Sequence, residues 1–415
     1  MSGARQSRVM AKIEKGALCA GCGGCAGVFR DKVSMEMAPP GFLRPRESAP
    51  LDATEEAALA RFCPALGQTV APEGRTDHVL WGPFLEMRSG WSTDPELRFA
   101  GASGGALSGI LLHLLESGAV EAVVQIAADP DNPIGNRTVV STTRAELIAA
   151  AGSRYAPSAP LERVLELVAS GRRHAFVGKP CDAAALRALA AERAEVAAAF
   201  PVIVSFFCAG VPSETGARGV VSALGAAMPE LAGFRYRGQG WPGRATATLA
   251  NGDAPSMSYH ESWGRILSRH VQHRCKICAD GTGKAADIVC ADAWESDAAG
   301  YPVFDEAPGV SLIVARTALG ARLIAEAGAA GRIETQPFDV DGLAAIQPGQ
   351  RERRRALLAR LAALRLTGQP IPAYRGLHLR AAARQNPPLR NLRNFLGTLR
   401  RVLRASFGRR GKIPR

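Results

Sequence analysis

Eight of the chain's nine cysteines separate into two groups of four. The first group is Cys19, Cys22 and Cys25, in the run C-A-G-C-G-G-C, with Cys63 as a distant fourth member. The second group is Cys181, Cys208, Cys275 and Cys278. Four thiolates are the usual ligand set of a [4Fe–4S] cluster. The two groups therefore predict an electron carrier with two such clusters.

The first group carries the stronger signal. Its three close cysteines can surround one face of a cluster, and the glycines between them let the backbone approach. Cys63 is followed by Pro64, as in bacterial ferredoxin sequences. A structural zinc ion and unligated thiols are the alternatives. The short spacing among glycines favours a cluster over zinc.

The second group is dispersed, and its spacing leaves the presence and the absence of a cluster equally open. The pair Cys275 and Cys278 also suits zinc or a redox dithiol. Cys181 and Cys208 each follow a predicted apolar strand, where they could be small core residues. Cys290 lies within the apolar run A-D-I-V-C-A-D, and we expect it to serve packing alone.

Two glycine-containing segments are candidates for binding a phosphate. Residues 100–105 (A-G-A-S-G-G) precede a predicted helix, whose free amides and dipole would suit an anion. An ordinary Gly/Ser helix cap is the alternative. Arg154 and Tyr155, in a predicted turn, could contact a phosphate and stack on a ring, or form a surface pair. There is no G-x-G-x-x-G after a strand and no Walker A motif, so a conventional dinucleotide fold is unsupported.

Alternating elements position these residues. Helices are predicted over 52–62, 106–116, 144–151, 161–170 and 183–199, and strands over 119–127, 174–177, 202–207, 287–289 and 311–315. This order predicts an α/β (mixed α+β) fold with a central sheet flanked by helices and a small N-terminal ferredoxin-like iron–sulfur lobe. Cys181 and Cys208 follow strand ends, where open α/β sheets place their chemistry.

Four segments are expected. Residues 1–80 form a loop-rich iron–sulfur lobe with little apolar material, so we expect its order to depend on metal. Residues 81–165 form the N-terminal part of the core, and residues 166–345 form its C-terminal part with the second cysteine group; the family resemblance described below implies that the first of these parts binds a flavin and the second holds an iron–sulfur site. Residues 346–415 form a basic helical tail.

Composition favours a protein of the reducing cytoplasm. The N-terminus lacks an apolar signal region, and no apolar stretch reaches the roughly 18 residues that span a bilayer. Nine cysteines in 415 residues are too few for a disulfide scaffold. We therefore expect a cytoplasmic protein, and the tail leaves a peripheral place at the inner membrane face open.

The positive charge belongs to the tail. From Arg351 onward there are 18 Lys and Arg residues and one acid, which gives the tail a net charge of +17. Since the whole chain carries +13, the preceding 350 residues carry a net charge of −4. Apolar residues recur there at helical spacing with arginines between them: Leu392, Phe395, Leu396, Leu399, Val402, Leu403 and Phe407. Such a helix suits an anionic membrane surface or an acidic partner. A solvated extension is the alternative, and the lack of interleaved Tyr or Trp disfavours specific nucleic-acid binding.

The order of these motifs resembles the coenzyme F420 (deazaflavin) hydrogenase/dehydrogenase beta-subunit family, which includes chlorophyll-pathway reductases of vinyl or hydroxymethyl groups. The resemblance covers about residues 17–320. Besides the first cysteine group, the matching segments are residues 101–106 (G-A-S-G-G-A), 152–157 (G-S-R-Y-A-P), 178–182 (G-K-P-C-D), 207–210 (F-C-A-G), 237–243 (R-G-Q-G-W-P-G), 262–264 (S-W-G), 275–280 (C-K-I-C-A-D) and 286–294 (A-D-I-V-C-A-D-A-W).

The resemblance implies an FAD beside two 4Fe-4S clusters, and it favours the second cysteine group as a ligand set. It places the flavin contacts at Gly101, Ser103, Gly104, Gly105, Ser153, Arg154, Tyr155 and Lys179. The family usually has Gly-Thr-Pro-Cys where this chain has Lys179, and Gly-Asp where it has Ala291-Asp292. These two departures bear on which acceptor binds over the flavin, more than on the flavin itself. No catalytic residue is identified, and Asp280 and Asp292 are candidates only for neighbours of a proton donor.

The predicted function is that of an iron–sulfur flavoprotein oxidoreductase. Electrons from a ferredoxin-like or deazaflavin donor would reach a small-molecule acceptor: a deazaflavin, a tetrapyrrole or a saccharide precursor. A non-catalytic electron-transfer subunit of a larger redox complex and a zinc-stabilised binding protein are the alternatives.

Iron content tests the assignment of the cysteines. Two clusters predict about eight irons per chain after anaerobic purification. Iron and acid-labile sulfide analysis measures this, and a value well below eight contradicts the two-cluster interpretation. Zinc without iron would select the binding protein.

Overall fold

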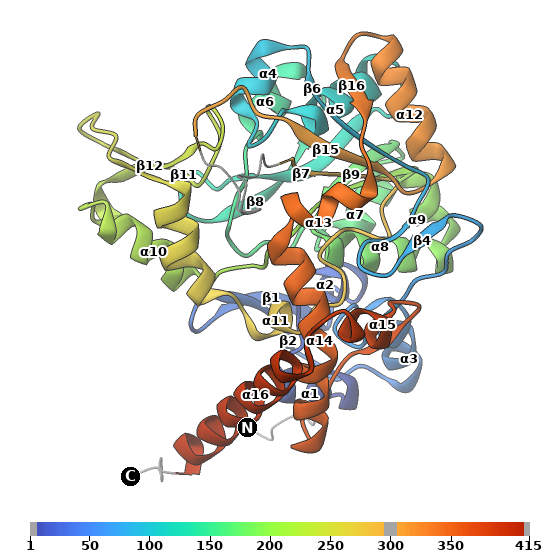
Figure 1. Cartoon of the computed structure of the whole chain (residues 1–415), viewed down its shortest axis with the longest axis vertical. Coiled ribbons are helices and arrows are strands. Elements are labelled where there is room, and N and C mark those ends of the chain that lie inside the picture. The colour runs from blue at the N-terminus through green and yellow to red at the C-terminus, as the bar shows by residue number, and fades with distance from the viewer. Residues whose placement is uncertain (1–5, 294–304, 411–415) are drawn as a thin grey trace.

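A mixed sheet of eight strands forms the centre of the protein (Figure 1). The computed structural model describes residues 6–293 and 305–410, with side chains described as far as residue 404, so Trp294 of the 286–294 motif lies outside the described residues. The strand order is β16-β6-β15-β14-β10-β9-β7-β8. In chain order these strands are β6 (Glu86–Ser92), β7 (Ala122–Ala128), β8 (Asn136–Ser141), β9 (His174–Gly178), β10 (Val202–Phe206), β14 (Ile288–Asp292), β15 (Ser311–Ala315) and β16 (Ile333–Pro337).

The centre of the sheet is parallel and its edges are antiparallel. Strands β7, β9, β10 and β14 pair in parallel, and the four outer pairings are antiparallel. Every residue of β9 and β15 is buried, as expected for strands covered on both faces. Strand β6 of segment 81–165 lies between β16 and β15 of segment 166–345, and β7 pairs with β9, so these two segments build one core. The mixed α/β fold predicted from the sequence is confirmed.

Helices cover both faces of the sheet. One face carries α4 (Pro95–Ala100), α5 (Ala106–Glu116), α6 (Arg144–Ala149) and α12 (Ala318–Ala329). The other carries α7 (Val164–Ala169), α8 (Pro180–Glu192) and α9 (Ala194–Ala199). The helix predicted over 183–199 is therefore two helices. The break lies at Arg193, whose backbone is extended (φ −136°, ψ 105°).

The N-terminal lobe packs beneath the second face. Its elements are α1 (Arg8–Lys15), α2 (Gly24–Val28), β1 (Val33–Ala38), β2 (Phe42–Glu47), α3 (Ala53–Phe62), β3 (Gly67–Thr69), β4 (Thr76–His78) and β5 (Gly82–Phe84). The β1–β2 hairpin was not predicted. Met10, Ile13, Leu59 and Phe62 are buried in the same apolar cluster as residues of α8 and of α14 (Pro348–Leu366). The lobe thus has more apolar contact than its sequence indicates, because the rest of the chain supplies it.

A smaller layer lies against one side of the sheet. It consists of α10 (Glu214–Ala223), the three-stranded sheet β11 (Leu231–Arg235), β12 (Arg244–Leu249) and β13 (Ser256–Ser258), and helical turns over His260–Ile266 and Leu267–His270. This layer has its own apolar cluster, which includes Phe234 and Tyr236. Tyr236 donates a hydrogen bond to the Ile134 carbonyl at 2.6 Å, which ties the layer to the loop before β8.

The C-terminal segment is packed against the body. It contains α13 (Leu343–Ile346), α14 (Pro348–Leu366), β17 (Ala373–Arg375), α15 (Leu379–Arg384) and α16 (Pro388–Arg410). Leu357 and Leu361 of α14 are buried in the core of the N-terminal lobe, and β17 pairs in parallel with β3. In Figure 1 the first and last elements lie together below the sheet. No helix in the described parts of the chain is long and apolar enough to cross a bilayer.

Shortening a buried side chain of α14 tests whether this segment belongs to the folded body. Leu357 is 0% exposed, and Leu357→Ala should lower the free energy of unfolding by about 2–5 kcal/mol because it leaves a cavity. Leu366 on the same helix is 71% exposed, so Leu366→Ala is the matched control, with an expected change within about 0.5 kcal/mol. Urea unfolding measures both. Equal effects would mean that α14 is not part of the core.

Candidate functional site

The first cysteine group comes together beside the α2 helix. Cys19 and Cys22 lie in the loop between α1 and α2, Cys25 lies in α2, and Cys63 ends α3. All four line one small cavity, and their thiols interact electrostatically with one another. Burial raises the pKa of Cys63 to about 12, so its thiol stays neutral unless a cation compensates the thiolate. The apolar walls of this cavity include Ile13 and Phe62.

A glycine in the cysteine run is required by close packing. Gly23 has φ +83°, and a Cβ atom there would lie 2.8 Å from the Glu162 nitrogen and 2.9 Å from the Ala159 carbonyl oxygen. The cysteine loop can therefore approach the segment before α7. Gly21 donates its N–H to the Cys19 sulfur at 3.3 Å. The run thus combines close packing at Gly23 with a backbone donor to a thiol at Gly21.

The second cysteine group is also brought together. Cys181 lies in the first turn of α8, Cys208 follows β10, Cys275 lies in α11 (His273–Lys276) and Cys278 follows that helix. Cys208 interacts electrostatically with Cys181, Cys275 and Cys278. Among the described residues, no group of three or more His, Cys, Asp or Glu side chains is arranged to hold a single metal ion.

Two side chains connect the cysteine groups. Gln272 donates Nε2 to the Ala20 carbonyl at 3.3 Å and to the Cys275 sulfur at 3.5 Å. Arg274, 3% exposed, donates Nη2 to the Pro64 carbonyl at 2.8 Å. Its Nε and Nη1 atoms have no hydrogen-bond partner. It interacts electrostatically with cysteines of both groups. A buried guanidinium in this position calls for negative charge, which metal-bound thiolates would supply.

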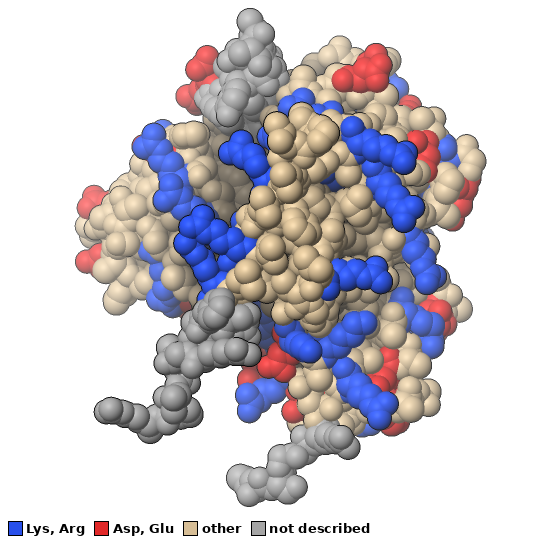
Figure 2. All heavy atoms as spheres, turned by 60° about the horizontal axis from the view of Figure 1, so that its bottom comes forward, with Lys and Arg blue, Asp and Glu red and all other residues tan. Residues whose placement is uncertain are grey.

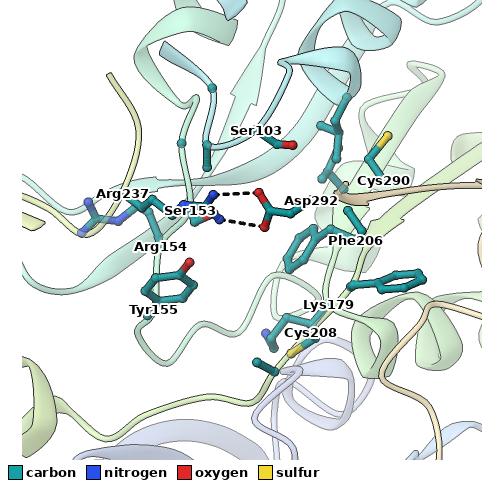
Figure 3. A pocket seen from close by; sticks show the side chains of 18 of the residues that line it. Ser103, Ser153, Arg154, Tyr155, Lys179, Phe206, Cys208, Arg237, Cys290 and Asp292 are labelled. Carbon is teal, nitrogen blue, oxygen red and sulfur yellow. Dashed lines mark hydrogen bonds and ion pairs between the residues drawn. The ribbon is translucent and has the colours of Figure 1, made fainter. Parts of the chain in front are cut away.

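A cavity of about 280 Å³ lies at the carboxyl ends of β9 and β10 (Figure 3). Its wall includes the 101–108 segment, the 150–156 turn, residues 206–211 after β10, and aromatic residues of the smaller layer. Cys208 of the second cysteine group belongs to this wall. A cavity of this size falls near the lower end of small-molecule and cofactor sites.

An ion pair crosses one side of the cavity. Nη1 and Nη2 of Arg237 donate to the two carboxylate oxygens of Asp292 at 2.8 and 2.7 Å, as Figure 3 shows. Trp241 donates Nε1 to the same carboxylate at 3.2 Å, and the Arg237 guanidinium lies 4.9 Å from the centre of the Tyr259 ring. Burial would lower the pKa of Arg237, but Asp292 together with the nearby Tyr155 and Tyr259 raises it above its usual value. The pair fixes β14 to the smaller layer.

A second ion pair lies at the cysteine end of the cavity. Lys179, 6% exposed, donates Nζ to Asp182 and to the Ser158 hydroxyl, both at 2.8 Å. Burial alone would lower the pKa of Lys179, but the Asp182 carboxylate and the nearby Cys181 and Cys208 raise it above its usual value. The lysine that departs from the family pattern is thus a buried cation between the cavity and the second cysteine group.

The amino end of α5 faces the cavity. Gly105 precedes the helix at φ +69°, and no side chain caps it. Gly101, Ser103 and Gly105 line the cavity, whereas Gly104 packs behind them, where a Cβ atom would lie 2.8 Å from the Gly90 oxygen. The Ser103 hydroxyl donates to the Val310 carbonyl at 2.9 Å. Uncapped amides at a helix start are suited to an anion.

The 153–155 turn supplies the opposite wall. Tyr155 lies 4.8 Å from the Trp263 ring centre, so aromatic surface borders the cavity. Arg154 instead donates to the Asn136 side chain at 2.6 Å and to the carbonyls of Phe234 and Pro133 at 2.9 and 2.8 Å. Its guanidinium therefore holds the turn in place. Ser153 lines the cavity.

Three site residues were missed or assigned another role by sequence reasoning. Arg237 was noticed only as part of a motif, and Arg274 was not singled out. Cys290 is 5% exposed and packs in the core as predicted, but it also borders the cavity. Asp280 lies elsewhere: it is buried and accepts a hydrogen bond from Gln68 at 2.9 Å. The one signal for Arg274 in the sequence was its place directly before Cys275 of the C-x-x-C pair.

Two family models match the chain. A family model described as coenzyme F420 hydrogenase/dehydrogenase, beta subunit N-term matches residues 87–166, and one for the C terminus of the same subunit matches residues 171–341. These matches contain the sheet and most of the cavity wall. The first cysteine group and helices α14 to α16 lie outside them.

Individual relatives extend the likeness. The coenzyme F420 hydrogenase subunit beta of Methanothermobacter thermautotrophicus is 26% identical over 313 residues, covering 71% of this chain and 100% of the relative. That of Methanococcus voltae is 25% identical over 317 residues, covering 70% and 99%. A chain of the F420-reducing [NiFe] hydrogenase complex from Methanosarcina barkeri shares the fold, with a TM-score of 0.51 and 21% identity over 70% of this chain and 90% of that chain.

Removing the partner of a buried arginine tests the ion pair beside the cavity. Asp292→Asn leaves Arg237, 2% exposed, without its carboxylate and should lower the free energy of unfolding by about 3–5 kcal/mol. Asp253 lies in an exposed turn, so Asp253→Asn is the control, with an expected change within about 0.5 kcal/mol. Urea unfolding followed by tryptophan fluorescence measures both. A small effect at Asp292 would contradict a desolvated pair.

Proposed function

Because the chain belongs to the coenzyme F420 hydrogenase/dehydrogenase beta-subunit family, we propose that it is an iron–sulfur flavoprotein oxidoreductase. It takes electrons from a ferredoxin-like or deazaflavin donor and passes them to a small-molecule acceptor. When bound, iron–sulfur clusters transfer single electrons and FAD converts between one- and two-electron chemistry.

One observation carries this proposal: the second cysteine group borders the cavity. Cys208 belongs to both, and Lys179 interacts electrostatically with Cys208 while lining the cavity. Gln272 and Arg274 in turn connect the second group to the first. Three sites in series suit electron transfer, since its rate falls steeply with distance.

The donor sets fit two iron–sulfur clusters. Cys19, Cys22, Cys25 and Cys63 would hold the first cluster, and Cys181, Cys208, Cys275 and Cys278 would hold the second. Each set is four thiols, which is the usual ligation of a [4Fe–4S] cluster. The unpartnered Nε and Nη1 atoms of the buried Arg274 support negatively charged centres on both sides.

The wall of the cavity offers groups that suit the phosphates and the ring of a flavin dinucleotide. The uncapped start of α5, with Gly101, Ser103 and Gly105, would bind the phosphates, and Gly104 lets that loop pack on β6. Tyr155 and Trp263 offer aromatic surface to a ring. Arg154 positions the Ser153–Tyr155 turn, and Lys179 places a cation in the wall, which would favour the added negative charge of a reduced ring.

A second candidate is an electron-transfer subunit of a larger redox complex. The names of the relatives favour it, because both are called subunits of a hydrogenase. In this case a partner protein would occupy the mouth of the cavity, and no small acceptor would reoxidise the chain alone.

Stepwise reduction distinguishes the candidates. The chain is purified anaerobically, reconstituted with iron, sulfide and FAD, and mixed with reduced ferredoxin or reduced F420. Loss of flavin absorbance near 450 nm, followed by its recovery on adding an acceptor, supports the oxidoreductase. Cluster absorbance without bound flavin supports the carrier subunit. Zinc without iron contradicts both.

Replacing the arginine between the cysteine groups should change their reduction potentials. Arg274→Gln removes a buried positive charge, so accepting an electron becomes less favourable and the potentials fall. The expected shift is on the order of 50–100 mV, from a charge about 7–10 Å away at an effective dielectric constant of about 20. Potentiometric titration followed by electron paramagnetic resonance measures it.

Two variants control this measurement. Arg274→Lys keeps the charge and should restore most of the potential. Arg61 on α3 forms an exposed pair with Glu192 near the first group, so Arg61→Gln should leave the potentials unchanged. Unchanged potentials in Arg274→Gln would show that the guanidinium does not act on the centres.

A further inference from the structure

Three cations from separate parts of the chain converge beside the second cysteine group. Lys276 stands between Cys275 and Cys278, Arg360 comes from α14 and Arg401 comes from α16. Arg360 donates Nη1 to the Lys276 carbonyl at 2.9 Å, and both arginines interact electrostatically with Lys276. We call these three residues the basic patch.

The basic patch is not neutralised within the molecule. In the described ranges 6–293 and 305–404, none of its three side chains has a carboxylate within ion-pair distance. The nearby acid of α14, Glu352, already pairs with Arg351, Arg355 and Arg390. The three positive charges repel one another, which destabilises the folded chain. A negatively charged surface bound there would reduce this repulsion.

Another side of α16 exposes apolar side chains, whereas Arg401 lies on the side of Thr398, to whose hydroxyl it donates at 3.0 Å. Leu389, Leu392, Leu396 and Leu403 are 75%, 51%, 50% and 45% exposed. Their spacing of three, four and seven residues puts them on one side of α16, away from the buried Thr398. Arg393, Arg400 and Arg404 are exposed next to this row. Exposed apolar side chains bordered by cations are typical of a surface that binds another molecule.

Figure 2 shows more Lys and Arg than Asp and Glu side chains on the lower face of the molecule. In the sequence, the residues from Arg351 onward carry a net charge of +17 and lie outside the two family matches, whereas the preceding 350 residues carry −4. The net positive charge of the chain therefore belongs to the segment that contains most of α14 and all of α16.

We infer that α14 and α16 form a docking site for an acidic one-electron carrier protein, with the basic patch above the second cysteine group. The inference rests on the proposed function and names its partner surface. Charge complementarity selects the acidic partner, and Lys276 places the contact within one residue of Cys275. The reduced carrier would be oxidised by one electron, and a [4Fe–4S] cluster held by the second cysteine group would be reduced by that electron without proton transfer.

Binding of a small acidic [4Fe–4S] ferredoxin to the full reconstituted chain tests the docking site. At low ionic strength, the Kd for the ferredoxin should rise about tenfold in each of the single variants Arg401→Glu and Arg360→Glu. The affinity of the wild type for the ferredoxin should fall as salt is added. Arg322 lies on α12, at the opposite end of the molecule in Figure 1, and pairs with Glu326. Arg322→Glu is the matched control and should bind as the wild type does.

Electron transfer is measured separately from binding. Arg401→Glu should be reduced by dithionite as the wild type is, but more slowly by reduced ferredoxin. Patch-dependent binding without any reduction supports the docking site and contradicts the proposed function. Reduction by ferredoxin that is equal in Arg401→Glu, Arg322→Glu and the wild type overturns the docking site and leaves the function intact.

A membrane surface is the competing occupant. Sedimentation with vesicles of phosphatidylglycerol and phosphatidylcholine distinguishes it from the protein partner. Vesicle binding that is lost in Arg401→Glu, with ferredoxin affinity unchanged in that variant, would overturn the inference in favour of a lipid surface.

Discussion

The buried guanidinium of Arg274 is the interaction on which the arrangement of the two cysteine groups depends. It is 3% exposed, bonds the Pro64 carbonyl beside Cys63, and acts electrostatically on Cys275 and Cys278. A cation this deep is costly unless negative charge surrounds it. The Cζ atom of Arg274 lies 5.8 Å from the centre of the Tyr374 ring, and among the described residues Nε and Nη1 have no hydrogen-bond partner. The site therefore contains a buried positive charge, and metal-bound thiolates would provide the negative charge that compensates it. Because Arg274 acts on cysteines of both groups, this interaction connects the N-terminal lobe to the sheet.

The parallel centre of the sheet positions the other residues of the candidate site. The carboxyl ends of β9 and β10 meet at one edge, so Lys179, Cys181 and Cys208 arrive at the same place from different segments. The smaller layer then closes the space over this edge, and the Arg237–Asp292 pair fixes its position. A cavity with a cysteine in its wall results from these two layers together, and neither layer forms it alone.

The C-terminal segment has two roles in this structure. The inner face of α14 completes the core of the N-terminal lobe through Leu357 and Leu361, and Arg354 donates to the Ala279 carbonyl at 2.9 Å, next to Cys278. Its outer side, with α16, gathers positive charge near Lys276. The same helices therefore support the loop that carries Cys278, and in the proposed docking site they form the surface that a partner protein would meet.

The sequence by itself determined the strands and helices whose patterns are local. The helix over 106–116 begins and ends where the structure has α5, and the strand over 311–315 matches β15, because apolar periodicity and glycine boundaries act over a few residues. The first cysteine group was recognisable because three of its members lie within seven residues. The family resemblance indicated the second group, but only the tertiary structure showed that its members lie together, and it alone decided the Arg237–Asp292 pair and the place of Arg274. Their members are tens to hundreds of residues apart, and only packing of the sheet, the smaller layer and the N-terminal lobe brings them together.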